Sequence, residues 1–570
     1  MPGPSLGRLP IAAAVAHPPA AAALFVRQWT AARVVLAVAL AAGATLRFIG
    51  LGTVGLNSDE AVYASQAASL AGNTHFVSLF PVVRAHPLLF QMLLSPLYRA
   101  GVPDTSGRYV AAAFGVGTIA MLYVAGKLIY SARAGALAAL FLAVMPYHVT
   151  VSRQIILDGP MSFFTTAALT CCAASARTGA RRWLVAAGMC LGIAALSKET
   201  AVIFVGSVFV FLCLLHSAWR PTRYPLAAGA AAVGLTLVYP MLTALAGGTR
   251  GGQSYLLWQL TRHPNHTFGF YLTTVGAAMG LVLIAVAVFG LLIRPAISWR
   301  EVLLLCWLGI PLAFFEVWPV KGYSYLMPVA PVMALLAAQA IVRIPQASGR
   351  PRRFGLAAAG VVACLCTVSL AVPAVHAATA VPTSGLAGAG GTPGGRETGR
   401  WVDAQLPPSA RLLTIGPSMA NLIRYYSGRQ ADGLSVSTNP LHRNPSYASV
   451  ANPDAALRSA TYQYVVWDAY SAGRSSRFGA EATSLALRFR GRVVYVHKDA
   501  SGRPLIVIYQ VLAPAGKNAR APAPPQPPVR QPSSAVLFVG YGGAVGFGVV
   551  LLAWAAGVVR LRGSRAAVPG

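Results

Sequence analysis

The chain has 570 residues, of which 56% are hydrophobic and only 10% are charged, and its formal net charge is +31. This composition excludes an ordinary soluble globular protein and indicates a polytopic α-helical membrane protein. The positive charge does not point to nucleic acid, because no RNA- or DNA-binding motif accompanies it and arginines at helix ends meet anionic lipid headgroups. We therefore expect membrane lipid, and no nucleic acid, among the partners.

Residues 1–28 are Ala-rich, and the sequence His17-Pro18-Pro19 interrupts their apolar stretch. A full-length span follows directly, which argues against a cleaved secretory signal. We expect a loose cytoplasmic tail over residues 1–28 and a transmembrane domain over residues 29–375.

About twelve apolar stretches are long enough to cross roughly 30 Å of hydrocarbon. They lie near residues 31–52, 108–130, 134–150, 159–176, 183–197, 200–217, 224–246, 270–293, 301–318, 323–342, 354–375 and 534–559. Alternate connections are short and carry arginines, among them Arg133, Arg181 and Arg294, which the positive-inside rule places in the cytoplasm. The sequence thus predicts a multi-pass protein of the plasma (inner) membrane with both termini cytoplasmic.

The first outer loop, residues 53–107, is long and partly apolar. It contains two amphipathic segments, Ser58 to Leu70 and His86 to Ala100, which we expect to lie along the membrane surface. All seven cysteines fall inside apolar spans. The sequence therefore predicts neither a disulfide framework nor a cysteine-based zinc site.

Carboxylates are scarce before residue 376, and six of the seven fall on the same predicted side of the membrane. These six are Asp59, Glu60, Asp104, Asp158, Glu199 and Glu316. An ionisable group at membrane depth is expensive and is a candidate functional residue by default. We therefore expect an extracytoplasmic active site.

Residues 376–513 form a polar block with alternating strand-like and helix-like segments. The expected strands are Arg411 to Ile415, Tyr464 to Trp467, Val493 to His497 and Leu505 to Val511, with a helix through Tyr426 that Ser418 would cap. This predicts an extracytoplasmic α/β domain before the last helix. A Pro-rich linker over 514–533, a final span over 534–560 and a cytoplasmic tail over 561–570 complete the chain.

Five short segments follow one another in a fixed order on the predicted outer side. They are Leu56 to Ala64, Arg84 to Leu88, Ser152-Arg153 with Asp158, Leu196 to Thr200, and Lys321 to Pro328. Together they resemble the GT-C membrane glycosyltransferases, specifically the protein O-mannosyltransferase and aminoarabinose transferase group. The resemblance covers roughly residues 45–345, and the polar block matches the group only in position.

The resemblance implies a GT-C-like fold and a glycosyltransferase, a hexosyl- or pentosyltransferase, that takes its sugar from a polyprenyl-phosphate donor. The acceptor would be an extracytoplasmic protein, lipid or polysaccharide, reached by a single inverting displacement. This chemistry needs a carboxylate that takes the acceptor proton and cations that hold the departing phosphate. We predict catalytic roles for Asp59, Glu60 and Asp158, with Asp59 ahead of Glu60 as the base.

Substrate-binding candidates come from the same segments. They are Arg84, His86, Arg153, Lys198, Glu199, Lys321, Tyr323 and Tyr325. Arg84 is the favoured phosphate partner, because relatives often have Lys-Pro-Pro or His-Pro-Pro where this chain has His86-Pro87-Leu88.

Structural explanations remain open for several of these residues. Asn57 or Ser58 could cap a helix whose first turn merely holds two acids, and Asp158 could pair with Arg153. Lys198 could snorkel to the interface, and the aromatic residues near Lys321 could form an interfacial belt.

No metal ligand is assigned and no cofactor is required, although a divalent cation is possible. Asp59 and Glu60 could hold it, or His263 and His266 with help from a carboxylate. Two other functions stay open, a transporter or lipid flippase and a non-catalytic glycan-binding envelope protein. The sequence shows no internal repeat of the kind that many transporters carry.

Overall fold

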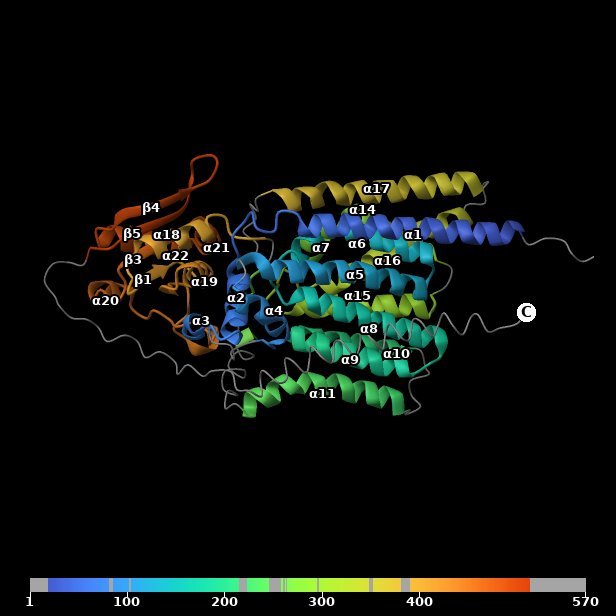
Figure 1. Ribbon diagram of the computed structural model, residues 1–570, viewed down its shortest axis with the longest axis horizontal. Helices are drawn as coiled ribbons and strands as arrows, with labels where there is room; N and C mark the ends of the chain where they lie inside the picture. Colours follow the sequence, from blue (N-terminus) through green and yellow to red (C-terminus); the bar gives the residue numbers. More distant parts are fainter. Residues whose placement is uncertain are drawn as a thin grey trace, which may run out of the picture.

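The computed structural model describes residues 19–80, 86–101, 104–214, 223–245, 258–259, 262, 264–294, 297–347, 352–380 and 390–512. A bundle of long helices and an α/β domain lie at opposite ends of the molecule, and short helices of the first loop lie between them (Figure 1).

The bundle has a helix at each of the first eleven apolar stretches. Its helices are α1 (Pro19–Phe48), α5 (Gly107–Ile129), α6 (Ala132–Ala143), α7 (Pro146–Ser152), α8 (Asp158–Thr178), α9 (Arg182–Ser197), α10 (Ile203–Leu214), α11 (Arg223–Leu245), α13 (Gly276–Met279), α14 (Leu281–Leu292), α15 (Trp299–Val317), α16 (Ala330–Ala347) and α17 (Arg352–Thr379). Among the described residues, four helices are long and apolar enough to cross a membrane, or six if each of two bent pairs is one span. The count of twelve stays a prediction, and its last span, 534–559, lies outside the described residues.

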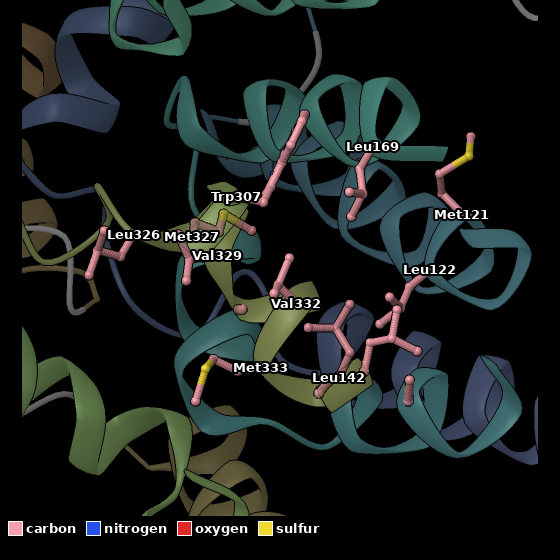
Figure 2. Packing of buried hydrophobic residues seen from close by; sticks show 14 of the residues in the cluster. Met121, Leu122, Leu142, Leu169, Trp307, Leu326, Met327, Val329, Val332 and Met333 are labelled. Carbon is pink, nitrogen blue, oxygen red and sulfur yellow. The ribbon is translucent and has the colours of Figure 1, made fainter. Parts of the chain in front are cut away.

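Apolar side chains and small residues hold the bundle together. Leu122 of α5, Leu142 of α6 and Val332 of α16 belong to one buried cluster (Figure 2). Gly126 and Gly135 let α5 and α6 approach closely, since a Cβ on Gly126 would lie 2.5 Å from the Gly135 Cα. Such small residues are common where membrane helices pack, because they allow backbone contact.

The helix axes of α6 and α7 bend by 64° at the break between them. A buried arginine binds the backbone carbonyl oxygens at this break. Arg47 donates to the carbonyl oxygens of Leu142 at 3.1 Å and Ala143 at 2.9 Å, and its Nη2 lies 2.9 Å from His148 Nδ1. These carbonyls end α6 and have lost their helical donors. The guanidinium therefore replaces the hydrogen bonds that the bend removes.

Three short helices of the first loop lie between the bundle and the α/β domain. They are α2 (Ser58–Leu70), α3 (Thr74–Leu79) and α4 (Leu89–Arg99). The two amphipathic segments are thus helical, and their position along the membrane surface stays a prediction. Most of α2 is buried, and it packs against α4 and α19 (Pro417–Ser427), so protein covers it on two sides.

The α/β domain is built on a five-stranded sheet with the order β2-β1-β3-β5-β4. Its strands are β1 (Arg411–Thr414), β2 (Gln430–Gly433), β3 (Tyr464–Asp468), β4 (Arg492–Lys498) and β5 (Pro504–Gln510), and its helices are α18 (Gly395–Gln405), α19, α20 (Pro453–Arg458), α21 (Ala469–Arg474) and α22 (Ser476–Arg488). Strands β2 and β3 run parallel to β1, whereas β5 runs antiparallel to both β3 and β4.

Two details of this domain differ from the prediction. Strand β2 was not expected, because its sequence Gln-Ala-Asp-Gly lacks the apolar alternation of a strand. Helix α19 begins at Pro417 with Gly416 as its N-cap, so the expected cap at Ser418 is wrong. Proline is favoured at the first helical position, where its missing N–H costs nothing.

Candidate functional site

The first turn of α2 is organised by Asn57. Its Oδ1 accepts hydrogen bonds from the backbone N–H groups of Asp59 and Glu60, both at 3.0 Å, and the Glu60 carboxylate accepts from the Asn57 N–H at 2.9 Å. This is a reciprocal capping box. Asn57 also donates to Gln154 Oε1 at 2.8 Å, which ties the helix start to the α7–α8 connection. The expected cap is therefore present, and it fixes both acids in place.

Glu60 is fully buried and neutralised. Arg108 of α5 donates to its two oxygens at 2.7 and 2.6 Å, and the Ile155 N–H donates to it at 2.9 Å. Both oxygens are thus occupied within the protein. This arrangement fits a structural role, holding α2 against α5 and the start of α8, better than the predicted catalytic one.

Asp59, the adjacent residue, has a different environment. It is exposed, and the part of the chain that the structure describes offers its carboxylate no hydrogen bond or ion pair. Loss of solvation among the surrounding residues raises its pKa, and the charges of His86, Lys198 and Arg474 partly oppose that rise.

Asp158 and Lys198 form a buried ion pair. The Lys198 Nζ donates to both Asp158 oxygens at 2.8 and 2.9 Å, and it lies 4.5 Å from the centre of the Tyr325 ring. Asp158 begins α8, and Lys198 follows the end of α9. The structure therefore brings three predicted site residues from three segments together.

Arg153 does not pair with Asp158, so the expected Arg153–Asp158 pair is wrong. Arg153 donates to the Leu46 carbonyl at 2.6 Å and the Ala378 carbonyl at 3.0 Å. These bonds join the ends of α1 and α17. The geometry places Arg153 at a helix junction, away from the Lys198 pair.

His86 and Glu199 form a second pair beside the first. His86 Nδ1 lies 3.0 and 3.1 Å from the two Glu199 oxygens, and the His86 ring meets Tyr63 of α2 edge-on at 6.0 Å. The charges of both His86 and Lys198 act on Asp59. Arg84, the favoured phosphate contact, lies outside the described residues.

The Lys321 segment contributes through its last aromatic residue. Lys321 is buried, with its backbone N–H and carbonyl bound to Asn265 and its Nζ donating to the Trp318 carbonyl at 3.3 Å. The Tyr323 carbonyl accepts a hydrogen bond from Tyr147 at 2.8 Å. Tyr325 is the residue of this segment that contacts Lys198.

Of the two histidines predicted as possible metal ligands, the structure describes one. His266 stacks on Phe270 at 4.1 Å, whereas His263 lies outside the described residues. Across the described ranges, no three His, Cys, Asp or Glu side chains are grouped so that they could hold a metal ion. Participation of a divalent cation remains a prediction.

Four residues of the α/β domain contact the start of α2 or interact electrostatically with Asp59. The sequence did not suggest them. Asn421 donates to Ser58 Oγ at 3.0 Å and to Tyr447 Oη at 2.9 Å. Tyr447, Tyr470 and Arg474 interact electrostatically with Asp59. No motif marks these residues, and the only local signal was the four-residue spacing of Tyr470 and Arg474 on a helix.

The other end of the bundle holds Glu301. Glu301 is buried, forms an ion pair with Arg294, and accepts a hydrogen bond from Tyr130 at 2.7 Å. Tyr130 ends α5, which has 23 residues and begins next to Arg108. At 1.5 Å per residue the two ends are about 34 Å apart. Acids are therefore present at both ends, and the exposed one is at the α2 end.

Comparisons with known proteins agree with the resemblance seen in the sequence. Residues 85–243 match the family model of dolichyl-phosphate-mannose-protein mannosyltransferase. No curated protein matches the chain by sequence search.

Solved structures share the fold over most of the chain. ArnT from Cupriavidus metallidurans in the apo state matches with a TM-score of 0.61 and 15% identity, covering 86% of this chain and 98% of that one. The same protein bound to undecaprenyl phosphate gives 0.59 and 18%, covering 84% and 98%. The Archaeoglobus fulgidus oligosaccharyltransferase tethered with an acceptor peptide gives 0.55 and 14%, covering 84% and 74%.

Proposed function

We propose that the chain is a GT-C membrane glycosyltransferase that moves a sugar from a polyprenyl phosphate to an acceptor outside the cytoplasm, and its fold and the family match over residues 85–243 support this proposal. The observation that carries this proposal is the environment of Asp59. One accessible carboxylate interacts electrostatically with two basic side chains, Lys198 and His86, whose positions are fixed by Asp158 and Glu199. A base next to preorganised cations is what glycosyl phosphate transfer requires.

In the proposed reaction, the acceptor hydroxyl attacks the anomeric carbon from the face opposite the phosphate. The new C–O bond forms as the bond to the phosphate oxygen breaks, and its electron pair leaves on the phosphate. Asp59 takes the hydroxyl proton. Lys198 and His86 stabilise the charge that grows on the leaving phosphate, and the configuration at the anomeric carbon inverts.

Three features support a lipid-linked donor. The related ArnT structure holds undecaprenyl phosphate, the site lies where several helices of the bundle end, and Tyr325 and Tyr63 add aromatic surface beside the cations. We propose that the site faces the outer side of the plasma membrane with both termini in the cytoplasm, as the arginine distribution predicts. The acceptor would then be a protein, lipid or polysaccharide of the envelope.

The function is tested with purified full-length protein in nanodiscs and a panel of labelled undecaprenyl-phosphate sugars. Envelope extract supplies the acceptor, and release of free undecaprenyl phosphate is measured. We expect release from one class of sugar donor by the natural chain and none by the Asp59→Asn variant. Failure to consume any donor would contradict the proposal, as would lipid flipping in vesicles that contain no sugar phosphate.

A further inference from the structure

The α/β domain contacts the residues on either side of Asp59. Tyr426 of α19 accepts a hydrogen bond from the Leu56 N–H at 2.8 Å, and Asn421 of the same helix donates to Ser58 at 3.0 Å. Arg396 of α18 donates to the carbonyls of Gly52 and Val54 at 2.9 and 3.1 Å. The domain is therefore docked on the start of α2, next to the proposed base.

The part of the domain that faces α2 includes the point where its sheet changes winding direction. The chain leaves β1 for β2 on one side and returns to β3 on the other. In open α/β sheets, ligands bind in the crevice at such a point, beyond the carboxyl ends of the strands. Here these ends lead into α19, which contacts Ser58, and into α21, which carries Tyr470 and Arg474.

The loops that follow the three parallel strands meet closely at this point. A Cβ on Gly416, after β1, would lie 3.2 Å from Ser435 Oγ and 3.7 Å from Ser471 Oγ, which follow β2 and β3. Asp468 is buried at the end of β3, and its Oδ1 accepts from the Ser471 N–H at 2.7 Å. Its Oδ2 has no hydrogen-bond partner among the described residues. Polar groups are thus concentrated at the sheet edge from which α21 starts.

Arg474 differs from the other cations near Asp59 in having no acidic partner. Lys198 is paired with Asp158, and His86 with Glu199. Arg474 is exposed, donates to Tyr470 Oη at 3.1 Å, and forms no ion pair within the described part of the chain. Its charge nevertheless acts on both Asp59 and His266. An arginine held by a neighbouring phenol and left without a carboxylate is available to an anionic ligand.

We propose that Arg474 and Tyr470 form an anion subsite that holds a phosphate or carboxylate group of the acceptor while the acceptor hydroxyl approaches Asp59. This inference rests on the proposed glycosyl transfer and specifies its acceptor as an anionic molecule. The donor phosphate is the other possible source of the anion. The donor must keep its lipid tail in the membrane, and the basic side chains that come from a bundle helix end and from the first loop are Lys198 and His86. Arg474 comes instead from the α/β domain.

The test compares the natural chain with Arg474→Gln, Arg474→Lys and the control Arg477→Gln, an exposed arginine on the next helix. Full-length proteins in nanodiscs receive a saturating labelled donor and graded amounts of envelope extract as the acceptor source. We expect Arg474→Gln to raise the half-saturating amount of extract about tenfold to a hundredfold, the value of one charge-assisted hydrogen bond or two. Arg474→Lys should recover part of the loss, and Arg477→Gln should behave like the natural chain.

Two further measurements separate the possible failures. Binding of undecaprenyl phosphate should be the same in all four proteins, and weaker binding by Arg474→Gln with unchanged acceptor saturation would assign the subsite to the donor and overturn the inference. If the natural chain and Arg474→Gln had the same half-saturating amount of extract, the inference would also be overturned. The proposed glycosyl transfer would not be affected by that result. If the natural chain released no lipid phosphate from any donor, the proposed function would fail first.

Discussion

The acidic residues at the two ends of the helical bundle have different environments. At one end, Glu301 is buried with Arg294 and Tyr130, so its charge is fully compensated. At the other end, Asp158, Glu199 and Glu60 are also paired, but Asp59 remains exposed near Lys198 and His86, which Asp158 and Glu199 hold. Pairing at both ends holds helix termini together, whereas Asp59, an exposed acid without an ion pair among the described residues, lies at the end covered by the α/β domain.

This difference separates residues that maintain the fold from a residue available for chemistry. A buried pair costs desolvation energy that its mutual attraction repays only with good geometry, so the carboxylates of Glu60 and Glu301 are occupied by Arg108 and Arg294. An acid that is accessible yet desolvated keeps free oxygen lone pairs and a raised proton affinity. Those are the properties that a general base needs.

The largest effect on stability should come from breaking a compensated pair. Replacing Glu60 by Gln leaves Arg108 buried without its counter-charge, which should cost about 3–5 kcal/mol of unfolding free energy. Asp403→Asn is the matched control, because Asp403 is an exposed acid whose ion pair with Arg429 is worth about 1 kcal/mol or less. Thermal unfolding in detergent measures both, and equal melting temperatures would show that Glu60 is not structural.

Removing the cation from the Lys198–Asp158 pair should have the next largest effect. Lys198→Met is expected to lower transfer about a hundredfold, as loss of one preorganised charge does, and to destabilise the fold by leaving Asp158 unpaired. The double variant Lys198→Met with Asp158→Asn removes both charges and should regain stability without regaining transfer. Full transfer by the double variant would mean that this pair, like Glu301 and Arg294, is only structural.

The pH dependence of the transfer rate should show a smaller effect, and it tests whether Asp59 differs from the paired acids. Loss of solvation raises the pKa of Asp59 above its ordinary 3.8, and the base must be deprotonated to act. Transfer should therefore fall about tenfold per pH unit below that raised pKa, starting at a higher pH than an unperturbed aspartate would give. An initial-rate profile that stays flat down to pH 4 would exclude Asp59 as the titrating base.

The smallest effect should come from loosening the docked domain. Arg396 donates to two carbonyls of the first loop and lies 3.4 Å from Asp104 Oδ2. Arg396→Gln should lose about 1 kcal/mol of docking free energy and lower transfer a few fold. Hydrogen exchange in α2 should increase in this variant, whereas Arg458→Gln on the distant helix α20 should leave it unchanged.

The sequence could predict the helices and the end of the bundle where most acids lie, because both depend on local patterns. Long apolar runs fold as helices wherever they occur, and charges collect at their ends. The expected segment Ser58 to Leu70 coincides with α2, whereas the sequence left its cap open between Asn57 and Ser58. The five segments that carried the family resemblance also brought Asp59, His86, Lys198 and Tyr325 into consideration together.

The partners of these residues could not be predicted, because they depend on tertiary packing. Lys198 pairs with an acid 40 residues away and His86 with one 113 residues away. A nearer arginine, Arg153, was the obvious choice for Asp158, yet it caps two other helices. Arg474 lies more than 400 residues from Asp59 in the sequence, and only docking of the α/β domain brings its charge to the site.

The most direct test of the central claim is the rate of undecaprenyl phosphate release by Asp59→Asn, measured together with its melting temperature. The substitution keeps the size of the side chain and the cap at Asn57, and removes only the ability to accept a proton. We predict a loss of about a hundredfold to ten-thousandfold in rate with an unchanged melting temperature. A rate near that of the natural chain would contradict the assignment of Asp59 as the base.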